Sequence, residues 1–493
     1  MVFSDLFFLF VFLPLFALCY VLALAVGRMT KGGVRVCTPD GQQRGSFALP
    51  NAVLVVFSLF FYAWGEPVYV FLMLLSVAAN YVAGLVVDGR KGGRGRRWAL
   101  GVGVAFNLLV LCVFKYLGFI ASQLLGLGLS VPQPNIALPI GISVYTFQSI
   151  SYLVDVYRRE APVQHRYCDL LLYISMFPQL IAGPIVRYDS VAHEIGHRHV
   201  SSDDLAEGIY RFVIGLGKKV VIANQLSEVA TQLLAPETLP QLSMASAWVG
   251  MVAFTLQIYF DFSGYSDMAI GIGRCLGFHF RENFDHPYCC TTITDFWRRW
   301  HISLGSFFRD YVYIPLGGNR RHQALNILVV WFLTGLWHGA SWNFVLWGLY
   351  FGLIVMFEKY TVLRLQRWMP SPLLHVYSLL LVVAGWGIFF FDDLGQMGLF
   401  FHAFMGMDGV PTDDLQAETA LTGHCWLWVA ALLLCLPVRR WVERAAERWL
   451  SGYTLIYSGA RVVFRSLLSL ALLAASVALL VGATSNPFLY TRF

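Results

Sequence analysis

Two histidines are the residues of this chain that could most readily do chemistry. His338 lies in an almost entirely apolar run, between Trp337 and Gly339, and His301 closes the polar, basic and aromatic block FWRRWH. An ionisable side chain inside a membrane-type segment is costly and usually faces the protein interior, so it marks a candidate functional site. Desolvation keeps such an imidazole neutral and able to accept a proton. A single buried histidine can also be structural, and the sequence leaves that alternative open.

The block around His301 is rich in arginine and tryptophan. If it forms one continuous helix, six residues share a face: Trp297, Arg298, His301, Leu304, Gly305 and Phe308. Guanidinium groups grip phosphates and indoles stack on planar groups, so this face suits a planar, phosphate-bearing ligand. The alternative is a juxtamembrane amphipathic helix that rests on anionic lipid headgroups. On the next helix, we expect Trp331, Thr334, Gly335, His338 and Trp342 to share a face.

Two carboxylates lie at membrane depth in QIYFDFSGYSDMAIGIG, residues 257–273. They are Asp261 and Asp267, and a carboxylate at the centre of a span costs on the order of 2.5–3.5 kcal/mol. Each should therefore pair with a cation, and we expect the arginines of residues 296–309 to be the partners. A structural ion pair and a direct part in proton handling are both compatible with the sequence.

The segment HEIGH, residues 193–197, matches the H-E-x-x-H pattern of zinc proteases. In that pattern, two histidines one helical turn apart bind zinc and the glutamate activates water. Gly196 weakens the helix that the pattern requires, and polar residues flank it. We therefore expect a solvated loop and no metal site, with a zinc protease as the alternative. The nine cysteines include no CxxC pair and predict no zinc framework or disulfide scaffold.

The elements that must position these residues are membrane-spanning helices. The 493-residue chain is 57% hydrophobic and 13% charged, whereas soluble domains carry about 25% charged residues. We expect spans of about 20 residues near 6–27, 46–65, 67–88, 98–125, 136–156, 211–234, 244–263, 324–340, 341–358, 373–391, 419–437 and 463–484. Pro or Gly interrupts the apolar stretches 168–188 and 264–279, which predicts broken or re-entrant helices. The sequence thus predicts an all-α polytopic membrane protein, with 11–13 transmembrane helices in a single domain over 1–493.

The loops between the expected spans fall into two classes by their content of Lys and Arg. Lys and Arg gather in the loops 28–45 and 89–97, after the fifth span and before the last span, but 391–421 contains neither. Because cytoplasmic loops carry the excess of basic residues, we expect the basic loops and residues 280–323 in the cytoplasm and both termini outside. This bias explains the net charge of +6 without nucleic-acid binding.

Several strings resemble motifs of the membrane-bound O-acyltransferase (MBOAT) family. They are LPIGISVYTFQSISYLVDVYR, FPQLIAGPIVR, QIYFDFSGYSDMAIGIG, ENFDHPY, DFWRRWHISLGSFFRDYVYIPLGGNR and GLWHGASWNFVLWG. The resemblance covers about residues 3–360, is looser over 361–493, and points to the bacterial branch typified by the membrane protein of alginate O-acetylation. The family's catalytic WHG histidine maps onto His338, and the second functional position, in RRWHIS, maps onto His301.

The resemblance implies a multi-pass O-acetyltransferase of the bacterial inner membrane. It would pass acetyl groups from a cytoplasmic donor, acetyl-CoA, across the membrane for O-acetylation of a secreted exopolysaccharide such as alginate or cellulose. It would hold no permanent cofactor, and its partners would be membrane lipids and a periplasmic acetyltransferase that holds the polysaccharide. The candidate donor-binding residues are Arg298, Arg299, Arg309, Trp297, Trp337 and Asp267. The alternatives are teichoic-acid D-alanylation, lipid acylation, and a non-catalytic glycan or lipid transporter.

Overall fold

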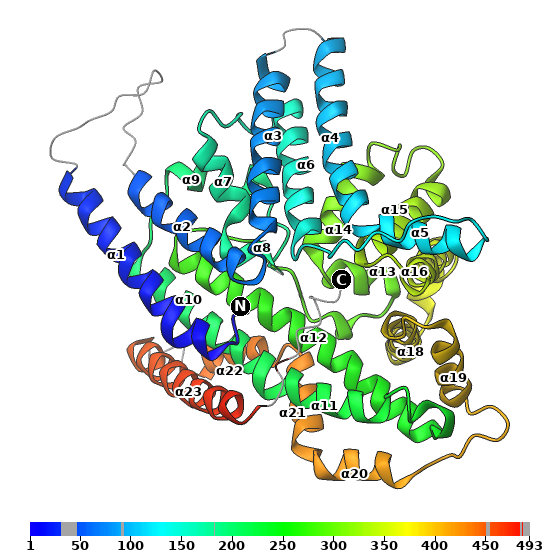
Figure 1. Cartoon of the computed structure of the whole chain (residues 1–493). Coiled ribbons are helices and arrows are strands. Elements are labelled where there is room, and N and C mark those ends of the chain that lie inside the picture. Colours follow the sequence, from blue (N-terminus) through cyan, green and yellow to red (C-terminus); the bar gives the residue numbers. More distant parts are fainter. Residues whose placement is uncertain (31–46, 90–92, 182, 450–453, 484–485, 487–493) are drawn as a thin grey trace. The chain divides into compact units, whose positions relative to one another are not determined.

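The computed structural model describes residues 1–30, 47–89, 93–181, 183–449, 454–483 and 486 (Figure 1). These residues form helices joined by turns and loops, and no β-strand occurs among them. The predicted all-α fold is therefore confirmed. Residues 31–45 of the first basic loop and 90–92 of the second lie outside the described residues, and the cytoplasmic position of all the basic loops stays a prediction.

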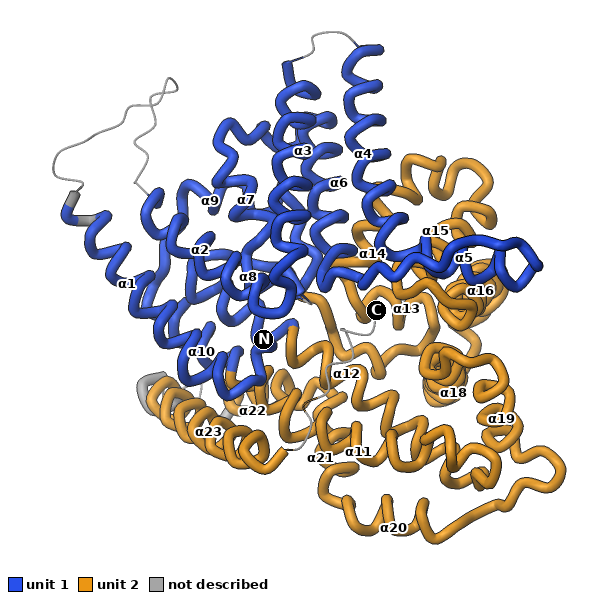
Figure 2. Tube along the Cα trace, viewed as in Figure 1, with its two compact units in different colours: residues 1–212, 266–281 blue, residues 213–265, 282–493 orange. Residues whose placement is uncertain are grey.

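The chain divides into two compact units (Figure 2). Unit 1 comprises Met1–Phe212 and Ser266–Arg281, and unit 2 comprises Val213–Tyr265 and Glu282–Phe493. Two helices, α10 (Ser202–Gly217) and α12 (Met244–Cys275), contribute residues to both units.

Unit 1 combines long apolar helices with shorter ones. Its further elements are the π-helical η1 (Phe8–Phe12), α1 (Leu13–Thr30), α2 (Ala48–Gly65), α3 (Tyr69–Gly89), α4 (Gly93–Lys115), α5 (Leu117–Gly126), α6 (Ile142–Arg158), α7 (Tyr167–Ser175), α8 (Phe177–Leu180) and α9 (Tyr188–Gly196). Helix α3 packs against both α4 and α6. Between α3 and α4, the buried amides of Asn80 and Asn107 donate to each other over 3.0 and 2.7 Å. Such reciprocal bonds satisfy polar groups that lipid cannot.

Unit 2 contains both candidate histidines. Its elements are η2 (Lys218–Ala223), α11 (Asn224–Leu233), η3 (Leu239–Gln241), η4 (Pro287–Cys289), α13 (Ile293–Arg299), α14 (Ile302–Phe308), η5 (Arg309–Tyr313), α15 (Gln323–His338), α16 (Trp342–Tyr360), α17 (Val362–Leu365), η6 (Gln366–Trp368), α18 (Ser371–Phe390), α19 (Leu394–Phe404), α20 (Leu415–Gly423), α21 (Cys425–Cys435), α22 (Val438–Trp449) and α23 (Thr454–Gly482). Helices α15 and α16 cross at backbone contact. A methyl group at Gly335 would collide with the carbonyl oxygen of Phe344, and one at Gly348 with that of Trp331. These glycines therefore allow α15, which ends at His338, to pack in backbone contact with α16.

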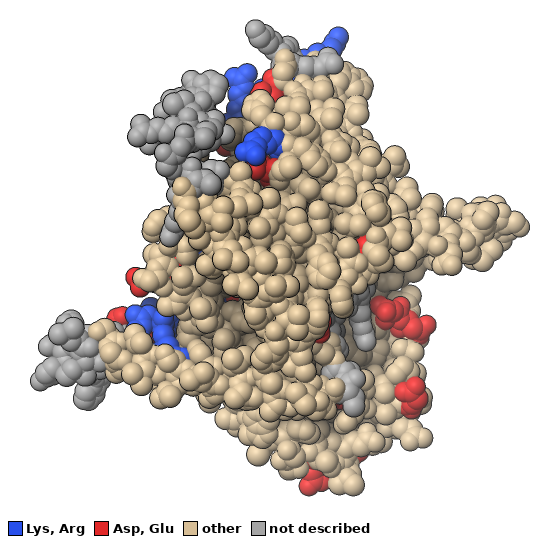
Figure 3. Space-filling view, turned by 60° about the vertical axis from the view of Figure 1, so that its left-hand side comes forward, with Lys and Arg blue, Asp and Glu red and all other residues tan. Residues whose placement is uncertain are grey.

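Seven helices among the described residues are long and apolar enough to cross a membrane: Phe8–Gly27, Ala48–Gly65, Tyr69–Gly89, Gly93–Lys115, Trp342–Trp368, Ser371–Phe390 and Ser458–Gly482. The bent pair α20 and α21 makes an eighth if it forms one span. On the face drawn in Figure 3, charged side chains form only small, separate patches on an uncharged surface. The predicted multi-pass architecture is confirmed.

The helices that meet this criterion are fewer than the 11–13 spans expected, because several apolar runs form short or divided helices. The run near 324–340 is the 16-residue α15, about 24 Å long at 1.5 Å per residue. The run at 211–234 is shared among α10, the π-helical η2 and α11. The stretch 168–188 is broken into α7 and α8, as predicted, but residues 264–275 continue the unbroken α12. Gly264, expected to break that helix, instead brings α12 close to the backbone of Gly215.

Candidate functional site

His338 lies at the end of a helix, inside an aromatic enclosure. It is the last residue of α15, Gly339 is extended, and α16 begins at Trp342. Only 8% of the side chain is exposed. Its ring is perpendicular to those of Trp347 and Phe389, with centroids 4.9 and 5.2 Å apart. The predicted face shared with Trp342 is wrong, because the chain leaves the helix between the two residues.

His301 lies at a break between two short helices. α13 ends at Arg299 and α14 begins at Ile302, and His301 adopts a left-handed backbone conformation with φ of 45°. The predicted continuous helical face from Trp297 to Phe308 is therefore wrong. A left-handed conformation is uncommon for a residue other than glycine and persists where the surroundings impose it. Here Ile302 donates its N–H to the Asn283 carbonyl over 3.0 Å, which anchors the break.

Asn283 orients the His301 ring and defines its tautomer. The Ser303 N–H donates to Asn283 Oδ1 over 3.2 Å, and the Ser303 hydroxyl does so over 2.8 Å. Because a backbone N–H can only donate, the amide atom at this position is the oxygen. His301 Nδ1 lies 3.1 Å from the same oxygen, so Nδ1 carries the proton and Nε2 the lone pair. Nε2 is buried and has no hydrogen-bond partner among the described residues. Sequence reasoning did not assign Asn283 a role, although it lies in the ENFDHPY string.

Both histidine rings contact one indole, that of Trp337. The Trp337 ring centroid is 5.7 Å from that of His301 and 4.9 Å from that of His338. Phe262 of α12 also packs against His301, with ring centroids 4.7 Å apart. The structure thus brings together the two residues that the sequence singled out, 37 positions apart, in one desolvated aromatic site.

Burial also determines the basicity of His301. The side chain is 2% exposed, and desolvation lowers its pKa from 6.5 to about 3. At neutral pH the ring is therefore uncharged, consistent with the tautomer derived from Asn283. So weak a base is better suited to accept a hydrogen bond than to remove a proton.

The lowered pKa predicts that acid destabilises the folded protein through His301. Between the ordinary pKa of 6.5 and the folded value of about 3, the unfolded state binds the extra proton, so stability falls as pH falls. The slope approaches about 1.4 kcal/mol per pH unit, and it vanishes above 6.5. Thermal unfolding of the purified protein between about pH 7 and pH 5 should decline more steeply for wild type than for His301→Asn. Parallel declines would contradict the assignment.

The arginines predicted for donor binding differ in their surroundings. Arg299 Nε donates to Asp295 over 3.0 Å, and Arg309 Nε donates to Asp310 over 2.7 Å. Arg298, on α13, is exposed. Because the other two guanidinium groups already have carboxylate partners, Arg298 is the best placed of the three to meet an anionic ligand.

Trp297 is enclosed by other aromatic rings. Its centroid lies 4.8 Å from that of Trp331, 5.4 Å from Trp347 and 4.9 Å from Phe351. These contacts favour a role in packing α13 against α15 and α16 over stacking on a ligand. The part of Trp297 and Trp337 in donor binding stays a prediction.

The two membrane-depth carboxylates do pair with cations, but the predicted partners are wrong. Asp261 pairs with Lys219 of η2 over 2.7 Å, and both side chains are only 3% exposed. Asp267 pairs with Arg211 of α10 over 2.9 Å. The cations come from α10 and η2 and not from residues 296–309, a pairing set by tertiary packing that the local sequence does not reveal. The buried Asp261 pair favours the structural alternative.

The HEIGH segment forms a short helix, α9, where the sequence predicted a loop. His193 is exposed, and its ring centroid lies 5.1 Å from that of His197, which is extended beyond the helix end. Glu194 accepts a hydrogen bond from His279 Nδ1 over 2.9 Å. Within the described part of the chain, no group of three or more His, Cys, Asp or Glu could hold a metal ion. These contacts give the zinc-protease alternative no support.

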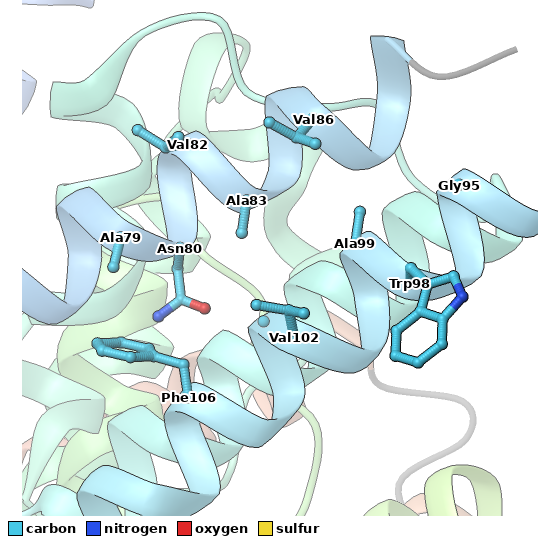
Figure 4. A pocket seen from close by; sticks show the side chains of 11 residues that line it. Ala79, Asn80, Val82, Ala83, Val86, Gly95, Trp98, Ala99, Val102 and Phe106 are labelled. Atoms are coloured by element: carbon cyan, nitrogen blue, oxygen red, sulfur yellow. The ribbon is translucent and has the colours of Figure 1, made fainter.

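A pocket of about 450 Å³ lies on unit 1, between α3 and α4 (Figure 4). It is lined by Ala79, Asn80, Val82, Ala83, Val86, Gly95, Trp98, Ala99, Val102, Gly103 and Phe106. None of these side chains is an acid, a base or a nucleophile. The pocket therefore lacks the groups for chemistry that the two histidines supply in unit 2.

Comparison with known proteins shows which protein family this chain matches. A model of the membrane-bound O-acyltransferase family, MBOAT, matches residues 102–395, which include both histidines. The chain is 39% identical to a probable alginate O-acetylase AlgI of Azotobacter vinelandii, over 89% of this chain and 84% of the relative. The AlgI of Pseudomonas putida is 36% identical over the full length of both chains. A peptidoglycan O-acetyltransferase of Helicobacter pylori is 32% identical, over 75% of this chain and 76% of the relative.

Proposed function

Because the chain belongs to the membrane-bound O-acyltransferase family, we propose that this multi-pass acyltransferase transfers acetyl groups from acetyl-CoA for O-acetylation of a secreted polysaccharide. The supporting observation is the pair of buried histidines whose rings both contact Trp337, with centroids 5.7 and 4.9 Å from that of the indole. The relatives' names, alginate O-acetylase and peptidoglycan O-acetyltransferase, favour an acetyl group and a polysaccharide acceptor. Of alginate and cellulose, they favour alginate. We place the enzyme in the bacterial inner membrane, because an enzyme there can reach both a cytoplasmic donor and an exported polymer.

His338 is the proposed catalytic residue. Its imidazole acts as general base on the accepting hydroxyl, whose oxygen attacks the acetyl carbonyl while the thiolate of CoA leaves. In the second version of the reaction, the imidazole itself takes the acetyl group and passes it on. Both versions need a neutral ring.

His301 positions a reacting group through Nε2. Its low basicity leaves proton removal to His338, while the Nε2 lone pair can accept a hydrogen bond from a hydroxyl or thiol. Asn283 holds the ring in the tautomer this requires. Replacing His301 therefore lowers turnover severely without the complete loss expected for His338.

The donor approaches from the cytoplasmic side. CoA carries several negative charges and does not cross the bilayer, so its phosphates need a basic surface in the cytoplasm. The exposed Arg298 on α13, three residues before His301, is the proposed contact for a donor phosphate. A periplasmic acetyltransferase that holds the polysaccharide receives the acetyl group on the other side.

Supplying alternative labelled donors tests this proposal. Purified protein should turn over acetyl-CoA, and should use a D-alanyl carrier protein or a long-chain acyl-CoA at least about tenfold more slowly. Faster use of either alternative donor would replace acetyl transfer by teichoic-acid D-alanylation or lipid acylation. A transporter without chemistry would turn over none of the three and would tolerate the loss of His338.

A further inference from the structure

Glu358 is a fully buried carboxylate that the proposed chemistry does not use. It lies near the end of α16, and its exposed fraction is 0%. A carboxylate buried in this way needs several hydrogen bonds to offset its desolvation. The structure supplies them from α13, a helix distant in sequence.

The carboxylate binds the first turn of α13. Oε1 accepts the N–H of Ile293 over 2.6 Å, and Oε2 accepts the N–H and the hydroxyl of Thr294 over 2.7 and 2.6 Å. The next N–H, of Asp295, is accepted by the hydroxyl of Thr292 over 3.0 Å. The first three N–H groups of α13, which have no partner within the helix, are therefore all satisfied. A negative charge at this end also complements the helix dipole.

Tyr377 of α18 is a further neighbour of the same carboxylate. It lies outside α13, so a change at Tyr377 leaves the bonds between the carboxylate and α13 in place. The two kinds of neighbour can therefore be separated by mutation.

Helix α13 links this carboxylate to the candidate site. It ends two residues before His301, and its Trp297 packs on Trp331 of α15 and Trp347 of α16. Helix α16 in turn lies at backbone contact with α15, which carries His338 at its end. Glu358 thus joins the helix that presents His301 to the helix pair that presents His338.

We propose that Glu358 is a positioning residue for acyl transfer: its carboxylate holds the start of α13 against α16 and thereby sets His301 relative to His338. This inference rests on the proposed function. Glu358 touches neither histidine in this arrangement and acts through the α13 backbone. The carboxylate form is required, because an amide in its place would turn an N–H donor towards the N–H of Ile293 or Thr294.

The test compares Glu358→Gln with wild type in acetyl-CoA turnover by the full-length purified protein. A displacement of about 1 Å at a reacting geometry can cost about 100-fold in rate, so we expect kcat to fall about 10- to 100-fold. The loss should appear in kcat at saturating acetyl-CoA; KM is not the readout, because α13 also carries Arg298, the proposed donor contact. A Glu358→Gln enzyme that is folded and has wild-type kcat would overturn the inference.

Two isosteric variants separate positioning from simple burial of a charge. Thr294→Val removes one bond between the carboxylate and α13, and should lower kcat about threefold or more. Tyr377→Phe removes a hydroxyl near the same carboxylate without touching α13, and should leave kcat within about twofold. Equal losses in both variants would contradict a role through α13. If Glu358→Gln fails to fold, the comparison of kcat between Thr294→Val and Tyr377→Phe still tests the positioning role of Glu358.

The same assay distinguishes failure of this inference from failure of the proposed function. If His338→Ala is inactive while both Glu358→Gln and Thr294→Val keep full kcat, only the positioning role of Glu358 is lost. If wild type turns over no acetyl-CoA, or if His338→Ala keeps its activity, the proposed function itself fails.

Discussion

Cells that carry His338→Ala should secrete polysaccharide without detectable acetylation, while the variant protein is made and inserted normally. Loss of a general acid–base group typically costs about 10²- to 10⁴-fold in rate, and loss of a nucleophile costs at least as much. The measurement is the acetyl content of the secreted polymer, normalised to the amount of the protein in the membrane. Retention of more than about a tenth of wild-type acetylation would refute the catalytic role, given the expected size of that loss.

His402→Ala provides the matched control. His402 lies on α19 of the same unit, is exposed, and is not one of the residues assigned to the site. It should leave acetylation unchanged within about twofold, as surface substitutions usually perturb little. A comparable loss in this control would mean that the assay reports expression or insertion and not catalysis.

The purified protein should be unable to acetylate the polymer without a partner. The longest stretch expected outside the cell, 391–421, forms α19, the start of α20 and a short connection between them. That connection is tied to the start of α12, where the N–H groups of Met244 and Ala245 donate to Pro411 and Thr412 over 2.9 and 3.0 Å. It is part of unit 2 and does not form a scaffold of its own, and segments below about 40 residues rarely fold unaided.

The charge of this stretch strengthens the expectation. It contains Asp392, Asp393, Asp408, Asp413, Asp414 and Glu418 and no Lys or Arg, so it would repel a uronic-acid polymer. Vesicles that contain the protein should be given acetyl-CoA on the cytoplasmic side and polymer on the other. Acetylation should appear only when a periplasmic acetyltransferase is added. Efficient acetylation by the protein alone would rule out the partner requirement.

The features of the fold that depend on composition could be predicted from the sequence. Long apolar runs gave the all-α, multi-pass fold, because composition and length alone decide whether a helix can span a membrane. Among the described residues, fewer helices than the 11–13 expected spans are long and apolar enough to cross a membrane, because hydropathy does not show where a run such as 211–234 divides into α10, η2 and α11. Helix ends at such places are set by tertiary packing.

The two histidines could be predicted from the sequence, but the local structure around them could not. His338 and His301 were identified from the cost of a buried imidazole and from motifs. The break at His301 depends on Asn283, 18 residues earlier in the chain, and spacing alone favoured a continuous helix there. The cation partners of Asp261 and Asp267, and the link from Glu358 to α13, are likewise long-range contacts. No periodicity in the local sequence encodes them.

Radiolabelled acetyl-CoA given to the purified protein tests whether His338 carries acetyl transfer. Wild type should release labelled acetate or retain label on the protein, whereas His338→Ala should do neither. Label retained on wild type and lost in the variant would identify His338 as a nucleophile, and turnover without label would identify it as a general base. Turnover by His338→Ala at the wild-type rate would show that His338 does not carry acetyl transfer.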